Sequence, residues 1–210
     1  MSVRSMPLPR PGTYSPLADV VLPRPTGRAA AVARDTALIL AGSLLVAASA
    51  RVAIPLPFSP VPITGQTFGV LLVGMLLGSR RGAMSLALYL LEGAAGLPVF
   101  SSGTFGLTIL RGATAGYLFS YPLAAFLLGW LTERGWDRKP LWTATAMVLG
   151  GFLILGLGSL WLTPFVGGYH NAFFKGVVPF LPGDIVKTVL AACLLPGGWR
   201  LLGKPKAGTG

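Results

Sequence analysis

Asp184 and Lys187 have the clearest potential for chemistry, because both lie within an apolar segment near the end of the chain. Ionisable groups inside a membrane-spanning segment are costly and therefore mark candidate functional sites. A spacing of three residues places both side chains on one helical face, where a carboxylate and an ammonium can pair or bind one ligand. The structural alternative is that Asp184 caps the helix after Pro182-Gly183 and Lys187 extends to the membrane interface.

Glu92 is the other ionisable residue within an apolar segment, and its sequence context assigns it no role. Asp35 and Glu133 stand at the ends of apolar segments, next to Arg34 and Arg134. Water and the neighbouring charge reduce the cost of an acidic group there. We therefore interpret both acids as helix-end residues.

Two loops rich in proline and glycine supply uncharged polar groups. Gln66 follows the loop 51–65, and Ser101 and Ser102 lie in the loop 96–112. Glycine lets the backbone approach a ligand closely, although turns require the same residue. These polar groups are candidate binding residues, and their pattern by itself is weakly specific.

Three tyrosines, Tyr89, Tyr117 and Tyr121, fall within or beside apolar segments. Each could form an apolar wall with a hydroxyl tip around a bound solute. Aromatic residues near the ends of spans also serve as interface anchors, and the sequence does not choose between these roles.

Catalysis is poorly supported by the residue inventory. His170 is the only histidine and Cys193 the only cysteine, so the chain cannot form a zinc constellation, an HExxH motif or an intrachain disulfide. His170 and Asp184 could formally join a serine in a triad, but no GxSxG nucleophile motif accompanies them. We therefore expect no catalytic residue, no metal and no cofactor, and a membrane enzyme stays a minor alternative.

The elements that must position these residues follow from composition and hydropathy. With 53% hydrophobic and 11% charged residues among 210, the chain is far more apolar than a soluble domain. Because one crossing needs about 20 apolar residues, this length accommodates about six spans. We predict an all-α integral membrane bundle of six transmembrane helices, at about 36–50, 66–78, 83–95, 113–132, 141–163 and 177–199.

The second and third apolar stretches are short for a full crossing. They either extend into flanking residues or dip partway into the membrane. Irregular backbone at membrane depth is tolerated where it lines a cavity, so the adjacent loops 51–65 and 96–112 point to a cavity there.

Basic residues divide unevenly between the two sides of the predicted bundle. Because loops rich in lysine and arginine are retained in the cytoplasm, we predict cytoplasmic termini and external loops at 96–112 and 164–176. Basic residues at segment ends, even with a net charge of +11, do not form the single basic face that nucleic acid requires. The external side carries only Arg51, Arg111 and Lys175. The cytoplasmic side carries Arg4, Arg10, Arg24, Arg28, Arg34, Arg80, Arg81, Arg134, Arg138, Lys139, Arg200, Lys204 and Lys206.

The predicted domain organisation is simple. Residues 1–33 hold arginines and prolines without an apolar run and are expected to form a disordered cytoplasmic N-terminal lead. Residues 34–202 form the six-helix membrane substrate-binding domain, and 203–210 a cytoplasmic tail. Ala48-Ser49-Ala50 would suit a signal-peptide cleavage site, but the charged lead before it is much longer than a usual n-region.

Small residues recur at intervals of four, which favours close packing of helices in lipid. We interpret two of these stripes as packing within the bundle and the third, Ala37 and Ala41 in the first span, as a face for a partner protein. The two bundle stripes are Gly112, Gly116, Ser120 and Ala124, and Gly74 with Gly78.

Four short segments of the sequence together resemble a known protein family. In chain order they are Pro60-Val61-Pro62-Ile63-Thr64-Gly65-Gln66-Thr67, Leu88-Tyr89-Leu90 with Gly96-Leu97-Pro98-Val99-Phe100, Gly112-Ala113-Thr114-Ala115-Gly116-Tyr117, and Leu181-Pro182-Gly183-Asp184-Ile185-Val186-Lys187. Together they closely resemble the BioY family, the biotin-binding S components of energy-coupling factor (ECF) transporters, from about residue 36 to 200.

This resemblance implies a compact six-helix bundle in the cell membrane, in bacteria the inner membrane, that takes up biotin from the outer face. It implies that Asp184 and Lys187 bind the vitamin together with Gln66 and the loop after Val99-Phe100. It further implies that Ala37 and Ala41 dock on a transmembrane coupling subunit driven by two ATPase subunits.

The chemistry of biotin agrees with these residues. A carboxylate at Asp184 could accept hydrogen bonds from the ureido N-H groups, and such charge-assisted bonds are the stronger ones. Lys187 would either receive the biotin carboxylate or neutralise Asp184. An S component for another vitamin is the nearest alternative, whereas a channel would need a polar stripe that continues through the spans.

Overall fold

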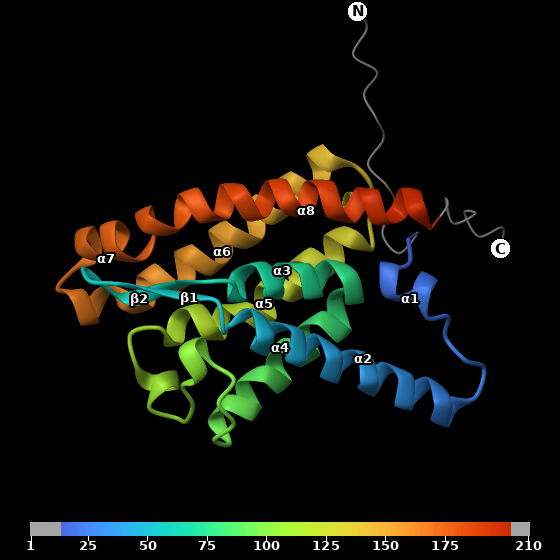
Figure 1. Ribbon diagram of the computed structural model, residues 1–210, viewed down its shortest axis with the longest axis horizontal. Helices are drawn as coiled ribbons and strands as arrows, with labels where there is room; N and C mark the ends of the chain where they lie inside the picture. Colours follow the sequence, from blue (N-terminus) through green and yellow to red (C-terminus); the bar gives the residue numbers. More distant parts are fainter. Residues whose placement is uncertain (1–13, 203–210) are drawn as a thin grey trace, which may run out of the picture.

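The computed structural model describes residues 14–202 as an elongated bundle of helices (Figure 1). The expected tail and the first thirteen residues of the expected lead lie outside the described residues. The long helices are α2 (Arg28–Ser49), α3 (Gln66–Leu77), α4 (Ser79–Ala94), α5 (Ala115–Thr132), α6 (Pro140–Val166) and α8 (Leu181–Leu201). Shorter elements are α1 (Leu17–Val21), β1 (Ala53–Leu56), β2 (Ser59–Thr64), η1 (Ser101–Gly103), η2 (Ile109–Arg111), η3 (Trp136–Arg138), α7 (Tyr169–Gly176) and η4 (Val178–Phe180).

Each of the six apolar stretches corresponds to one of the long helices, so the prediction of a mainly helical bundle is confirmed. Within the described residues, four segments are long and apolar enough to cross a membrane: α2, α5, α6 and Tyr169–Leu201, which contains α7 and α8. Helix α3 is apolar but shorter, with 12 residues. Six crossings and the orientation of the termini stay predictions.

The two ends of the bundle differ in construction. One end, here called the cavity end, carries the hairpin β1–β2, α7 and the loop between α4 and α5 (Figure 1). The other, the connector end, carries α1, the α3–α4 and α5–α6 junctions and the end of α8. Glu133, the residue that ends α5, accepts hydrogen bonds from Ser79 N and Oγ at 2.9 and 2.8 Å. Its interpretation as a helix-end residue is confirmed, because it supplies acceptors to the unpaired start of α4.

The expected disordered lead differs from the structure over its described part. Residues 17–21 form α1, and α2 begins at Arg28 because the alanine-rich run after Gly27 favours helix. Asp35 consequently lies within α2 rather than at its end. It pairs with Arg24, Arg34 and Arg81 at 3.5, 2.9 and 3.3 Å.

The loop 51–65 contains an antiparallel hairpin, which the helical interpretation of the chain missed. Ala53 pairs with Thr64 and Ile54 with Ile63, followed by an irregularity before Leu56 and Ser59. Prolines normally interrupt the sheet ladder, but each strand of a two-stranded hairpin has a free edge where a missing N-H costs nothing. Because the loop contains four prolines, its sequence did not predict the two strands.

Small residues let the helices approach closely in the bundle core. A Cβ atom at Gly74 would lie 2.5 Å from the carbonyl oxygen of Ala125, and one at Gly116 would lie 2.2 Å from Trp161 Cβ. Both positions are therefore incompatible with a larger side chain. The interpretation of these two stripes as packing within the bundle is confirmed, whereas Ala37 is exposed on α2.

Candidate solute-binding site

A cavity of about 530 Å³ lies at the cavity end of the bundle. Its walls come from the hairpin β1–β2, the start of α3, the loop between α4 and α5, the first turns of α5, and single residues of α6 and η4. These segments are far apart in sequence, so the cavity forms only when they come together in the fold. Its volume falls in the range of sites that enclose a small organic molecule.

Most of the cavity wall is apolar or aromatic. The Tyr117 ring stacks on Phe180 with centroids 6.2 Å apart, and its hydroxyl donates to the Gly176 carbonyl at 2.8 Å. The Tyr117 ring is therefore fixed in the cavity wall, and its hydroxyl proton is already used in the hydrogen bond to Gly176. Leu118 and Leu155 and the hairpin prolines continue this surface, which suits a ligand with a large apolar part.

Gln66 leads a chain of hydrogen bonds beside the cavity. Its Oε1 accepts from Thr64 Oγ1 at 3.1 Å, and its Nε2 donates to the buried Tyr89 hydroxyl at 2.5 Å. The Tyr89 hydroxyl in turn donates to the Val99 carbonyl at 2.9 Å. Each end of the Gln66 amide keeps one unused hydrogen-bonding position, so its orientation is fixed while it can still bind a ligand.

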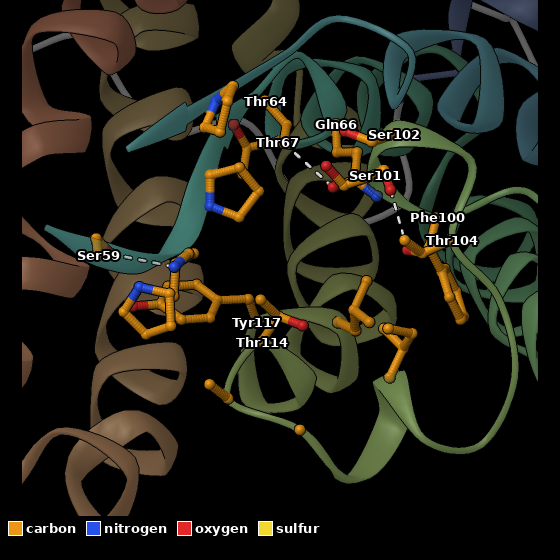
Figure 2. A pocket seen from close by; sticks show the side chains of 18 of the residues that line it. Ser59, Thr64, Gln66, Thr67, Phe100, Ser101, Ser102, Thr104, Thr114 and Tyr117 are labelled. Atoms are coloured by element: carbon orange, nitrogen blue, oxygen red, sulfur yellow. Dashed lines mark hydrogen bonds between the residues drawn. The ribbon is translucent and has the colours of Figure 1, made fainter. Parts of the chain in front are cut away.

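Ser101 presents an unpaired hydroxyl to the cavity. Its Oγ is buried and has no hydrogen-bond partner among the described residues. Its carbonyl is engaged by Thr104 Oγ1 at 2.9 Å, and Arg51 Nη2 holds the nearby Pro98 carbonyl at 2.6 Å. Because buried hydroxyls are nearly always paired, and this one lies in the cavity wall, it is a candidate position for a ligand group. Figure 2 shows Ser101, Ser102 and Gln66 close together on one side of the cavity.

Ser102 has a backbone conformation that side-chain-bearing residues rarely adopt. Its φ is 55°, and its N-H donates weakly to the Ala50 carbonyl at 3.4 Å. Strain of this kind persists only where the surroundings impose it, and it is frequent at binding sites. Holding this turn against the cavity therefore costs conformational energy, which the rest of the fold must offset.

Asp184 and Lys187 do not line the cavity, which differs from their expected position. Lys187 Nζ lies 3.1 Å from Asp184 Oδ1, as the three-residue spacing predicted, and donates to Thr67 Oγ1 at 2.7 Å. Thr67 does line the cavity, so one hydroxyl separates the ion pair from the enclosed space. Helix α8 begins at Leu181, so the alternative that made Asp184 the capping residue is wrong.

The structure therefore divides the predicted site residues into two groups. Gln66, Tyr117, Ser101 and Ser102 line the cavity. Tyr89 and Lys187 lie one hydrogen bond behind it, through Gln66 and Thr67 respectively, and Asp184 lies behind Lys187. Pro55, Leu56 and Ser59 also line the cavity, and they lie in the loop 51–65 beside which the sequence predicted a cavity, although none was named as a binding residue. Leu155 and Phe180 lie outside both predicted loops and were missed.

Glu92 lies away from the cavity lining. Its Oε2 accepts a hydrogen bond from Ser43 Oγ of α2, and Ser43 is fully buried. This carboxylate thus joins α4 to α2 inside the bundle. The bond gives Glu92 a structural role that its sequence context did not assign.

An apolar helical bundle with an enclosed site at one end defines a class of membrane protein that captures a small solute. Among residues 14–202, no group of three or more His, Cys, Asp or Glu side chains could hold a metal ion. The sequence profile of the BioY family matches residues 22–204. The chain belongs to the BioY family, which confirms the resemblance seen in its motifs.

Curated relatives cover most of the chain. The biotin transporter BioY of Rhizobium etli is 38% identical over 169 residues, which are 77% of this chain and 90% of that protein. The biotin transporter BioY of Thermotoga maritima is 39% identical over 159 residues, 76% of this chain and 88% of its own. The biotin transporter BioY of Rhodobacter capsulatus is 41% identical over 170 residues, 75% of this chain and 88% of its own.

The fold has a counterpart among solved structures. The crystal structure of the S-component for biotin from an ECF-type ABC transporter superposes with a TM-score of 0.68. The match covers 81% of this chain and 91% of the other, at 24% sequence identity. The mainly helical fold of this chain is therefore shared with that S-component.

Proposed function

We propose that the protein binds biotin and delivers it for uptake as the substrate-binding S component of an ECF transporter. One observation carries this proposal: three of the four strings that resemble the family contribute residues to the cavity wall, and the fourth, Leu181–Lys187, reaches it through the hydrogen bond from Lys187 to Thr67. Pro60–Thr67, the loop after Val99, and Gly112–Tyr117 all contribute to its wall. Relatives named biotin transporter support the choice of ligand.

The distribution of polar groups suits the two polar ends of biotin. One polar region contains Gln66, Ser101 and Ser102, and a second contains Thr67 with the ion pair of Asp184 and Lys187 behind it. The apolar part of the cavity wall suits the thioether ring and the aliphatic tail. A ligand that reaches the ion pair must displace the Thr67 hydroxyl from Lys187. Charge-assisted hydrogen bonds to Lys187 or Asp184 would offset the bond that is lost.

Equilibrium binding of radiolabelled biotin to the purified protein tests this function. We expect saturable binding that unlabelled biotin displaces and that excess thiamine or riboflavin leaves in place. Displacement by either of the other vitamins would contradict the assignment of the ligand. It would favour an S component for another vitamin.

The proposal includes an orientation in which the cavity end faces the outside. At the cavity end lie Arg51, Arg111 and Lys175, whereas the basic residues of the α3–α4 and α5–α6 junctions lie at the connector end. Loops rich in lysine and arginine are retained in the cytoplasm. Both termini would therefore be cytoplasmic, in the inner membrane of a bacterial cell.

Cysteine labelling in a Cys193→Ala background checks this orientation. Phe105→Cys, in an exposed loop position at the cavity end, should react with an impermeant maleimide added to intact cells. Arg80→Cys, exposed at the connector end, should react only after the membrane is permeabilised. The reverse pattern would show that the bundle is inserted the other way round.

A further inference from the structure

The hydroxyl group of Tyr89 joins two parts of the cavity wall. It donates to the Val99 carbonyl at 2.9 Å, just before the turn that carries Ser101 and Ser102, and it accepts from Gln66 Nε2 at 2.5 Å. Gln66 and the two serines line the cavity, whereas Tyr89 is fully buried behind it. Tyr89 can therefore act on a bound ligand through these neighbours without touching it.

Packing fixes the position of the Tyr89 ring. The ring meets Phe100 edge to face, with centroids 5.5 Å apart, and Phe100 is itself buried. Gly93, one turn after Tyr89 on α4, makes room for the Phe100 ring, because a Cβ atom there would collide with it. The Tyr89 hydroxyl is consequently held in one place by ring contacts, and its neighbours must orient around it.

The direction of the two hydrogen bonds determines which way the Gln66 amide is turned. A backbone carbonyl can only accept, so Val99 takes the single hydroxyl proton of Tyr89. The Tyr89 oxygen can then only accept a bond from Gln66. Gln66 must therefore turn its NH₂ group, and not its carbonyl oxygen, towards Tyr89.

Thr64, the other partner of the Gln66 amide, does not make this choice. Its hydroxyl donates to Gln66 Oε1 at 3.1 Å. A threonine hydroxyl can equally well accept a bond from an NH₂ group, so it would fit the amide in either orientation. Among these two partners, Tyr89 alone determines the order in which Gln66 presents a donor and an acceptor.

We propose that Tyr89 is a positioning residue that sets the orientation of the Gln66 amide for the ligand. The proposal rests on the proposed function, since biotin is the ligand whose affinity is measured. Both polar ends of biotin distinguish a donor from an acceptor, because its carboxylate only accepts and its ureido group carries donors and an acceptor on separate atoms. An amide of fixed orientation suits such a ligand, whereas an amide that turns over presents the wrong atom part of the time.

Tyr89→Phe tests this role, because it removes the hydroxyl and keeps the ring against Phe100. Equilibrium binding of radiolabelled biotin to the purified protein should show an affinity lower by roughly 2- to 12-fold, the effect of one uncharged hydrogen bond. The same substitution in a Gln66→Met background should change affinity by less than about twofold, because no amide is left to orient.

Tyr117→Phe is the matched control. It also removes a tyrosine hydroxyl that donates to a backbone carbonyl, but that carbonyl belongs to Gly176 and the hydroxyl has no bond to Gln66. Tyr117 lines the cavity, so its substitution can alter affinity by itself. The factor should be the same with and without the Gln66 amide.

Two results for Tyr89→Phe would overturn the proposal. One is wild-type affinity, and the other is an equal loss in both backgrounds, which is what a merely structural role of Tyr89 would give. If Tyr89→Phe does not fold, Gln66→Met still provides a test, since wild-type affinity there would leave no amide contact to position. Failure of the wild-type protein to bind biotin would instead refute the proposed function, before any variant is compared.

Discussion

Asp184→Asn should lower biotin affinity by about 10- to 150-fold, the effect of losing one charge-assisted hydrogen bond of about 1.5 to 3 kcal/mol. The substitution keeps the shape of the side chain but removes its charge and replaces one acceptor oxygen with an NH₂ donor. A ureido N-H would then face a donor, which adds to the loss. Equilibrium binding with radiolabelled biotin measures the change.

The present geometry adds a second route to the same loss. Asp184 Oδ1 lies 3.1 Å from Lys187 Nζ, and Lys187 Nζ donates a hydrogen bond to Thr67 Oγ1 at 2.7 Å. Neutralising Asp184 therefore weakens the position of both neighbours. Glu92→Gln is a suitable control, because Glu92 is another carboxylate in an apolar helix and bonds to Ser43 instead. Wild-type affinity in a folded Asp184→Asn protein would remove Asp184 from the site.

Lys187→Met separates the two roles that remain for the lysine. If Lys187 receives the biotin carboxylate, the variant should lose the preference for biotin over an uncharged biotin amide. If it neutralises Asp184, both ligands should weaken together. Competition between the two ligands in the same binding assay distinguishes these results.

The fold was predictable wherever hydropathy alone decides structure. Apolar runs in a chain of this composition have few alternatives to helices, because lipid cannot satisfy free backbone groups. The hairpin and α1 were missed for one shared reason. Both lie among prolines, and their order comes from contacts with distant residues, as Ser59 shows by donating to the Lys175 carbonyl at 2.8 Å.

Asp137 shows how a charged string can mislead. It stands beside Arg138 and Lys139, as a solvated turn would, yet it is fully buried and accepts from Trp199 Nε1 at 2.5 Å. Burial raises the pKa of Asp137 to about 6. The hydrogen-bond partner of the buried Asp137 is a tryptophan sixty-two residues away. The sequence around Asp137 gives no sign of this partner.

Four of the predicted site residues, Gln66, Ser101, Ser102 and Tyr117, line the cavity, whereas Tyr89, Asp184 and Lys187 do not. Spacing correctly predicted the pairing of Asp184 with Lys187. It could not reveal that Thr67 lies between them and the cavity, since that depends on how α3 packs against α8. The unpaired Ser101 hydroxyl likewise becomes visible only when burial and hydrogen bonds are known.

Ala37→Trp should abolish uptake that depends on the transporter partners while leaving biotin affinity nearly unchanged. Ala37 and Ala41 are exposed on α2, whereas Gly42 and Val46, on the other side of that helix, are buried. A bulky residue at position 37 would therefore project away from the bundle. It would hold a partner helix at a distance, because close helix contacts in lipid depend on small side chains.

Uptake and binding must be measured on the same preparation, together with co-purification of the coupling subunit. Ala87→Trp is the matched control, since Ala87 is also an exposed alanine, but on α4 and outside the stripe. It should retain uptake and co-purification. Loss of biotin affinity along with uptake in Ala37→Trp would contradict the prediction, because it would mean that the stripe supports the interior of the bundle.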